Sequence, residues 1–198
     1  MQTSKTKRGV SVITRFNLKF AVIIGILFVG LTIGNAWAAE QALRSAALEG
    51  HIEKVRTSLD QGTSPDARGP DGRTALMMAA FNGHTQAAQL LTDRGAKVNA
   101  HDGIGRTALM YAAAGPYTQT VQHLINNGAN LDIQDNEEGF TALMFAAAEG
   151  QTEVIKVLLS HGANIKISDK DGDTALDFAK KNGHQKAVQA LKKAMKGK

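Results

Sequence analysis

Three methionines at regular spacing are the first residues in this sequence whose chemistry stands out. Met77, Met110 and Met144 recur at nearly constant intervals. Thioether sulfur binds soft metal ions such as Cu(I). On stacked helices, however, equivalent positions lie about 8–10 Å apart, whereas the ligands of one metal converge to within about 2.5 Å of it. The spacing therefore predicts core packing or an apolar strip that faces a partner, and it predicts no metal site.

The six histidines show no ligand pattern either. Three of them each follow a turn glycine, and the other three share no i, i+4 pairing and no carboxylate pattern. We therefore expect no metal cofactor. The two groups are His51, His84 and His184, and His101, His123 and His161.

Catalytic machinery is not apparent in the sequence. The chain has no cysteine, and nothing in it resembles G-x-S-x-G, a P-loop or an H-E-x-x-H helix. Four aspartates, Asp71, Asp102, Asp135 and Asp169, recur at similar intervals beside glycines, which is typical of turn formers. We assign no catalytic residue and no cofactor, and we expect the protein not to be an enzyme.

These residues must be positioned by an internal repeat. The tripeptide Thr-Ala-Leu begins at Thr74, Thr107, Thr141 and Thr174, with a period of about 33 residues, and its flanks repeat as well. A degenerate copy begins at Ala42. Such self-similarity indicates a stacked repeat architecture, here with five repeats.

Twelve glycines fall into three columns that mark the same turns in successive repeats. Glycine enters left-handed backbone conformations without strain, so each column predicts a recurrent turn. The step from Thr107 to Thr141 is one residue longer than the other two, and the columns place the extra residue near 136–138. The columns are Gly50, Gly83, Gly150 and Gly183; Gly62, Gly95, Gly128 and Gly162; and Gly72, Gly105, Gly139 and Gly172.

Apolar residues between the glycines recur with a helical period, which predicts two short helices per repeat. The threonine at the start of each first helix is expected to cap it, its hydroxyl accepting from a free backbone N–H. Because helices this short are marginal alone, their stability must come from stacking.

The T-x-L-x-x-A-A-x-x-G-H start and the GAKVN, GANLD and GANIK ends resemble the ankyrin repeat. The resemblance implies an all-α solenoid of paired antiparallel helices joined by β-turn loops, with a protein as its partner. The expected repeats are 39–70, 71–103, 104–136, 137–169 and 170–198, the first and last being caps. Two departures stand out: methionine replaces the family's usual histidine after Thr-Ala-Leu, and Pro116, with Gly115 before it, predicts a local distortion.

Residues 1–38 have the order of a secretory signal peptide. Basic residues precede the apolar run Phe20 to Ile33, and small residues follow at Ala36 and Ala38. This order predicts cleavage between Ala38 and Ala39 by the general secretory route. Because the stretch from Phe20 to Ala39 is long enough to span a bilayer, an uncleaved membrane anchor is the alternative.

Without that segment the chain is formally neutral, since five of its 23 basic residues lie there and all 18 acidic residues follow it. A neutral mature domain does not favour nucleic acid as a partner. Lysines concentrate after Asp177. They indicate a polar terminal repeat or, alternatively, attraction to anionic lipid or an acidic partner.

The remaining surface that differs between repeats is the candidate partner-binding site. The resemblance implies that it consists of the turn tips and the exposed end of each first helix. It includes residue types enriched at interaction hot spots. The turn-tip candidates are Arg73, Ile104, Arg106, Glu137, Glu138, Phe140 and Asp173, and the helix-end candidates are Phe81, Asn82, Tyr117 and Glu149.

We therefore expect a monomeric, exported protein-binding scaffold in a bacterial periplasm. The alternatives are a scaffold tethered to the inner membrane by its uncleaved anchor and a secreted protein that binds a host target. Membrane contact is expected only through the uncleaved segment or the lysine-rich end.

Overall fold

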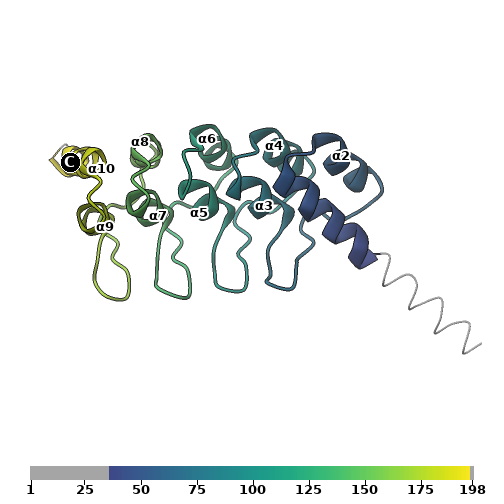
Figure 1. Cartoon of the computed structure of the whole chain (residues 1–198), viewed down its shortest axis with the longest axis horizontal. Helices are drawn as coiled ribbons and strands as arrows, with labels where there is room; N and C mark the ends of the chain where they lie inside the picture. The colour runs from purple at the N-terminus through teal and green to yellow at the C-terminus, as the bar shows by residue number, and fades with distance from the viewer. Residues whose placement is uncertain (1–35, 197–198) are drawn as a thin grey trace, which may run out of the picture. The chain divides into compact units, whose positions relative to one another are not determined.

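Short helices alternate with turns throughout residues 36–196, which the computed structural model of the chain describes (Figure 1). The helices form consecutive pairs, and each pair corresponds to one sequence repeat. The predicted all-α solenoid is thus confirmed. The pairs are 36–49 with α2 (Ile52–Asp60), α3 (Ala75–Phe81) with α4 (Thr85–Asp93), α5 (Ala108–Ala113) with α6 (Thr118–Asn126), α7 (Ala142–Ala148) with α8 (Thr152–Ser160), and α9 (Ala175–Lys181) with α10 (Gln185–Lys196).

The helices form two layers. The inner helices α3, α5, α7 and α9 contact one another in order, and the outer helices α2, α4, α6, α8 and α10 do the same. Loops at 63–73, 96–106, 129–140 and 163–173 extend beyond the inner layer, and we call them fingers. We call the surface formed by the fingers and the adjoining side of the inner helices the finger face.

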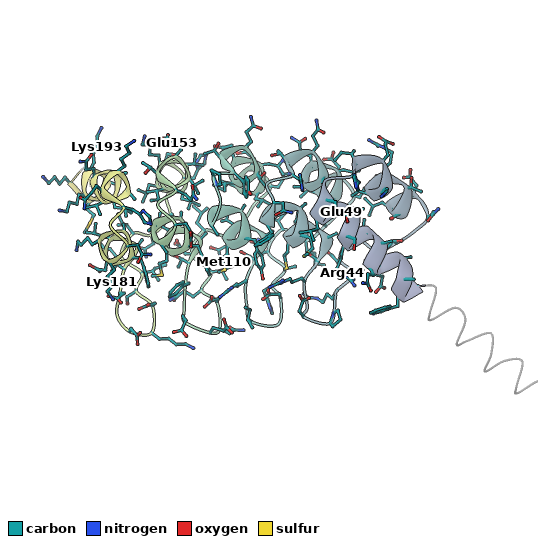
Figure 2. The ribbon with its side chains drawn as sticks, viewed as in Figure 1. Arg44, Glu49, Met110, Glu153, Lys181 and Lys193 are labelled. Atoms are coloured by element: carbon teal, nitrogen blue, oxygen red, sulfur yellow. The ribbon has the colours of Figure 1, made fainter. Side chains whose placement is uncertain are left out.

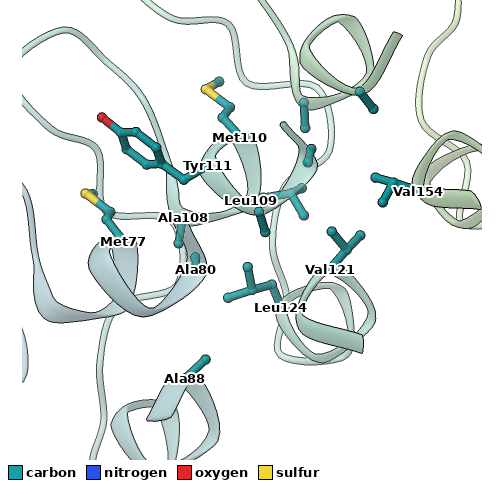
Figure 3. Packing of buried hydrophobic residues seen from close by; sticks show 14 of the residues in the cluster. Met77, Ala80, Ala88, Ala108, Leu109, Met110, Tyr111, Val121, Leu124 and Val154 are labelled. Atoms are coloured by element: carbon teal, nitrogen blue, oxygen red, sulfur yellow. The ribbon is translucent and has the colours of Figure 1, made fainter. Parts of the chain in front are cut away.

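One continuous apolar core runs between the two layers from Leu43 to Leu191. Paired alanines such as Ala112 and Ala113 are fully buried in the inner helices, where their small side chains let neighbouring helices approach closely. Leu109, Val121 and Leu124 fill the space between the layers (Figure 3). Because residues 39–198 form a single compact unit with its own core, we expect this unit to fold by itself.

The methionine column belongs to the core. Met77, Met110 and Met144 are at most 2% exposed, so a partner-facing strip is wrong and core packing is confirmed. Each sulfur also accepts the backbone N–H of the threonine that caps its own helix, at 3.4–3.5 Å. Methionine therefore takes the reciprocal place in a capping box, where glutamate is usual.

The predicted threonine caps are confirmed in three repeats and differ in the last. Thr74, Thr107 and Thr141 accept from the backbone three residues on, at 3.3–3.4 Å. Thr174 instead donates its hydroxyl to the Asp177 carboxylate at 2.6 Å, because a charged carboxylate is a stronger acceptor than a thioether. This bond, with help from Lys180, lowers the pKa of Asp177 to about 2.

The glycine columns and both irregularities are confirmed as well. All twelve column glycines have positive φ, from 65° to 91°. Helix α5 ends at Ala113 and is one residue shorter than α3, α7 and α9, which is the distortion expected before Pro116. The finger at 129–140 contains the extra residue.

Successive fingers are joined through their backbones. The N–H groups of Gly103, Asn136 and Lys170 donate to the preceding finger at 2.8–2.9 Å. Pro70 occupies the equivalent place in the first finger and has no N–H. The first finger therefore offers no backbone N–H at this position. It cannot donate the hydrogen bond that joins the other fingers, which disfavours pairing with another chain at this edge.

The predicted signal peptide lies almost wholly outside the described residues, and its cleavage between Ala38 and Ala39 stays a prediction. Within residues 36–196, no helix combines the length and the apolar character needed to cross a membrane.

Arg44 fits the repeat poorly. It occupies the place of the buried methionines, is 8% exposed, and its Nη1 has no hydrogen-bond partner among the residues that the structure describes. A buried cation without a partner is destabilising. We expect Arg44→Met to raise the free energy of unfolding by about 1–3 kcal/mol. Urea denaturation of residues 39–198 measures this change, and a lower midpoint for the variant would contradict the prediction.

Candidate partner-binding surface

Aspartates organise the base of the last three fingers, and two of them, Asp102 and Asp135, are buried. Asp102 Oδ1 accepts the backbone N–H groups of Ile104 and Arg106 at 2.9–3.0 Å. Asp135 Oδ1 accepts three such groups at 2.9–3.1 Å, because its finger has the extra residue. Asp169 repeats the pattern. The turn-former interpretation is confirmed for these three and also for Asp71, whose Oδ1 accepts the N–H of Arg73 at 3.1 Å. Asp71 lies two places further along its finger, because Gly69 occupies the position equivalent to Asp102.

The second carboxylate oxygen of Asp102 accepts a hydrogen bond within a cluster of polar side chains on the finger face. Tyr111 in α5 donates its hydroxyl to Asp102 Oδ2 at 2.5 Å, and Arg73 Nε donates to the same hydroxyl at 2.9 Å. The Arg73 guanidinium lies 5.2 Å from the Tyr111 ring centroid and pairs with Asp71 at 3.4 Å. The charge of Arg73 is therefore largely compensated within the protein.

Arg106 makes the corresponding contacts one repeat later. Its Nε donates to Asp135 at 3.3 Å, and its Nη2 donates to Glu137 at 3.2 Å. The guanidinium lies 5.1 Å from the ring centroid of Phe145 in α7. Both arginines thus connect one finger to the inner helix of the next repeat, and their orientation is fixed before any partner binds.

In the fourth repeat, Phe140 occupies the position of Arg73 and Arg106 and packs against other aromatic rings. The Phe140 ring lies edge to face with Phe145 and Phe178, with centroid distances of 5.4 and 4.7 Å. Lys181 approaches the Phe178 ring and forms an ion pair with Asp173. The site is therefore more apolar around Phe140, whereas the last repeat again places a charged pair, Asp173 and Lys181, on this face.

Phe81 is the most exposed large apolar side chain of the predicted set. It is 53% exposed at the C-terminal end of α3, and its ring meets Tyr111 edge to face at 6.0 Å. Ala114, Ala148 and Lys181 occupy the equivalent positions in later repeats. Phe81 is thus the single large apolar side chain at this register in the second to fifth repeats, where it is supported by the Arg73 cluster, and the partly buried Leu48 occupies the position in the first.

The other predicted residues are more dispersed. Asn82 donates to Leu48 O at 2.8 Å, and Glu149 is exposed at the end of α7. The carbonyls of Ile104 and Glu138 accept from the following finger, at 2.8 and 2.9 Å. The Asn82 side chain and the backbone carbonyls of Ile104 and Glu138 therefore form hydrogen bonds with neighbouring repeats.

Tyr117 does not lie with the inner-helix residues as predicted. It is the N-cap residue of α6, and its half-buried ring packs against the backbone of Gly83 and Gly115. His84 and His184 occupy the same place in their repeats, and each reaches a carbonyl of the preceding repeat at 2.9–3.0 Å. In this repeat the turn glycine, Gly115, lies one place earlier, because Pro116 occupies its usual position. The sequence alone therefore did not show that Tyr117 aligns with these histidines.

The repeated pattern of finger, inner helix and outer helix agrees with the comparison to known proteins. The family model described as Ankyrin repeats (3 copies) matches residues 43–135 and again 114–197, well over half of the chain. The chain belongs to the ankyrin repeat family. No curated protein matched it. Ankyrin repeats imply protein–protein interaction, and proteins of this family are typically not enzymes.

Sequence reasoning missed one column of this ankyrin repeat surface. Met78, Tyr111, Phe145 and Phe178 occupy one register position in successive inner helices, four residues after each threonine. They share the helical apolar period of core residues, yet three of them are only partly buried. Their spacing could have revealed the column.

The buried Tyr111 predicts a pH dependence for the ankyrin domain. Burial, together with its bond to Asp102, raises the pKa of Tyr111 to about 12. An unfolded tyrosine ionises near pH 10, so the folded state loses relative stability as the pH rises from about 10 to 12. We expect the wild type to lose up to about 2 kcal/mol more than Tyr111→Phe over this interval. Urea denaturation at pH 9.5 and 11.5 tests this, and equal losses would contradict it.

Proposed function

We propose that this protein is an exported scaffold that binds a protein partner through its finger face. The observation that carries the proposal is Phe81, an exposed aromatic side chain next to the Arg73, Tyr111 and Asp102 cluster. Aromatic and arginine side chains are enriched at hot spots. Because the cluster is already ordered by hydrogen bonds, binding would cost little additional side-chain entropy.

The partner surface should combine an apolar pocket with polar groups at its rim. Phe81 offers the apolar anchor, and Glu137 and Lys170 provide exposed charges at the finger tips. The arginines keep their intramolecular acidic partners, so they supply shape and cation–π contacts more than net charge. A partner recognised only by strong negative charge fits this surface poorly.

Crosslinking in the producing cells tests this surface. A photoreactive phenylalanine at position 81 is expected to give a defined adduct with a protein partner, and the same group at exposed Gln89 on the outer helix α4 is not. Phe81→Ala should weaken binding of the captured partner about 30-fold, as at a hot spot of about 2 kcal/mol. Equal adducts from both positions, or an unchanged Kd, would contradict the assignment.

Arg73 and Arg106 are less suitable for this test. Both hold the fingers to neighbouring repeats, so their replacement would alter stability together with binding. Phe81 has no such polar role, which makes its substitution a cleaner probe.

Export to the periplasm is the second part of the proposal and rests on the order of residues 1–38. N-terminal sequencing after cell fractionation is expected to find a mature start at Ala39 in the soluble exported fraction. An intact Met1 in the membrane fraction would replace this proposal by a membrane-tethered scaffold.

A further inference from the structure

The outer helix of the last repeat presents an uncompensated basic face. Ala187, Val188 and Leu191 of α10 are buried on one side. The opposite side carries four exposed lysines, spaced so that they share the solvent half of the helix. None forms an ion pair with an acidic side chain in the described part of the chain. They are Lys186, Lys192, Lys193 and Lys196; Figure 2 labels Lys193 at this end of the molecule.

Charge is distributed unevenly along the folded unit. Residues 170–198 contain eight lysines and three aspartates, whereas residues 39–169 contain ten basic and fifteen acidic residues. Two of the three aspartates, Asp173 and Asp177, pair with Lys181 and Lys180 of α9. The acidic side chains of the last repeat therefore do not neutralise α10, and the positive end of the molecule is this helix.

An exposed apolar side chain borders these lysines at the edge of the buried side of α10. Met195 is a large apolar side chain, yet it is 51% exposed. It follows Lys192 by one helical turn. A soluble polyanion would gain nothing from contact with this thioether. The boundary between headgroups and acyl chains of a bilayer accepts both an apolar side chain and the lysines around it.

We propose that α10 is a docking surface for a membrane rich in anionic phospholipid. The four lysines spread over the solvent half of one helix, which suits a planar array of headgroups. The four lysines and Met195 include no aromatic side chain on which a nucleic acid base could stack. The predicted passage of residues 1–38 through a membrane would place the protein beside such a surface. The proposal does not depend on partner binding by the finger face.

Co-sedimentation with lipid vesicles tests the proposal on residues 39–198. With vesicles of phosphatidylcholine and phosphatidylglycerol mixed two to one, the wild type is expected to bind at low ionic strength and to be released as salt is added. Each lysine near such a surface contributes about 1 kcal/mol, about fivefold in partitioning. Changing all four α10 lysines to glutamine should therefore lower partitioning more than 100-fold.

A matched variant separates this helix from net charge. Lys54, Arg56, Lys97 and Lys166 are exposed outside the last repeat, and changing these four to glutamine alters the net charge equally. This variant should retain most of the vesicle binding. Equal losses for the two quadruple variants would overturn the assignment to α10.

Met195→Gln distinguishes a membrane from another polyanion. It should weaken binding to the vesicles several-fold and leave any binding to a short DNA duplex unchanged. Wild-type binding to the duplex without binding to the vesicles would overturn the proposal in favour of a nucleic acid surface. Absence of binding to both probes would leave only a polar end cap and would overturn it too.

Discussion

Replacement of Asp135 by alanine is expected to lower the free energy of unfolding by about 3–5 kcal/mol. The Asp135 side chain is fully buried. Its Oδ1 accepts three consecutive backbone N–H groups of the finger at 129–140, and its Oδ2 accepts from Arg106. Alanine would remove the acceptor of the three N–H groups and of Arg106 Nε, although Arg106 Nη2 would keep Glu137. Urea denaturation of residues 39–198 measures the loss.

Two further variants make the Asp135 result specific. Asp135→Asn keeps an acceptor oxygen but loses the charge, so its cost should be intermediate. Asp171→Ala, in the exposed tip of the last finger, should change stability by less than about 0.5 kcal/mol. In Asp135→Ala, amide hydrogen exchange should accelerate most at residues 138–140. A uniform acceleration, or a loss no larger than that of Asp171→Ala, would show that Asp135 does not organise the finger.

Gly83→Ala is the second substitution with a large expected effect, about 3 kcal/mol of destabilisation. Gly83 has φ +69°, where a Cβ is strained, and a Cβ there would lie 2.1 Å from Tyr117 Cδ1. The backbone strain alone costs about 1–2 kcal/mol. The remainder arises because the Tyr117 ring must leave its place over Gly83. Thermal or urea denaturation measures the sum.

The steric part of this effect can be isolated. Gly95 has a similar φ of +84°, but nothing lies within 4 Å of its hypothetical Cβ. Gly95→Ala should therefore show the backbone strain alone. Combining Gly83→Ala with Tyr117→Ala should cost less than the two single substitutions together, because the clash is then absent. Strict additivity would exclude the ring contact as the cause.

The fold could be predicted from the sequence because its determinants are local. Thr74 and its equivalents mark the helix starts, and the column glycines mark the positive φ turns. The longer step between Thr107 and Thr141 places one extra residue near 136–138, in the finger at 129–140. Each signal depends on the conformational preference of one residue or on the period of one helix. Repetition then strengthens every signal several-fold.

The candidate site could be predicted only in part. Phe81 and the finger tips lie where the resemblance implied, and their role in binding stays a prediction. Tyr117 was misplaced because Gly115 and Pro116 shift the turn in that repeat. The aromatic column at Tyr111, Phe145 and Phe178 was missed because a half-buried aromatic side chain has the same helical period as a core residue.

Residue types and their spacing were enough to specify the number of repeats, the turns, the caps and the absence of cysteine chemistry. Burial and ion pairing became known only from the stacked repeats. The methionine column is buried, and Arg73 and Arg106 have acidic partners, whereas the lysines of α10 have none among residues 36–196. The reason is that turns and caps depend on residues close together in the chain, whereas burial and ion pairing depend on residues from different repeats. Side chains in successive repeats become neighbours only after the repeats stack, and whether a charge is then paired or free depends on those neighbours.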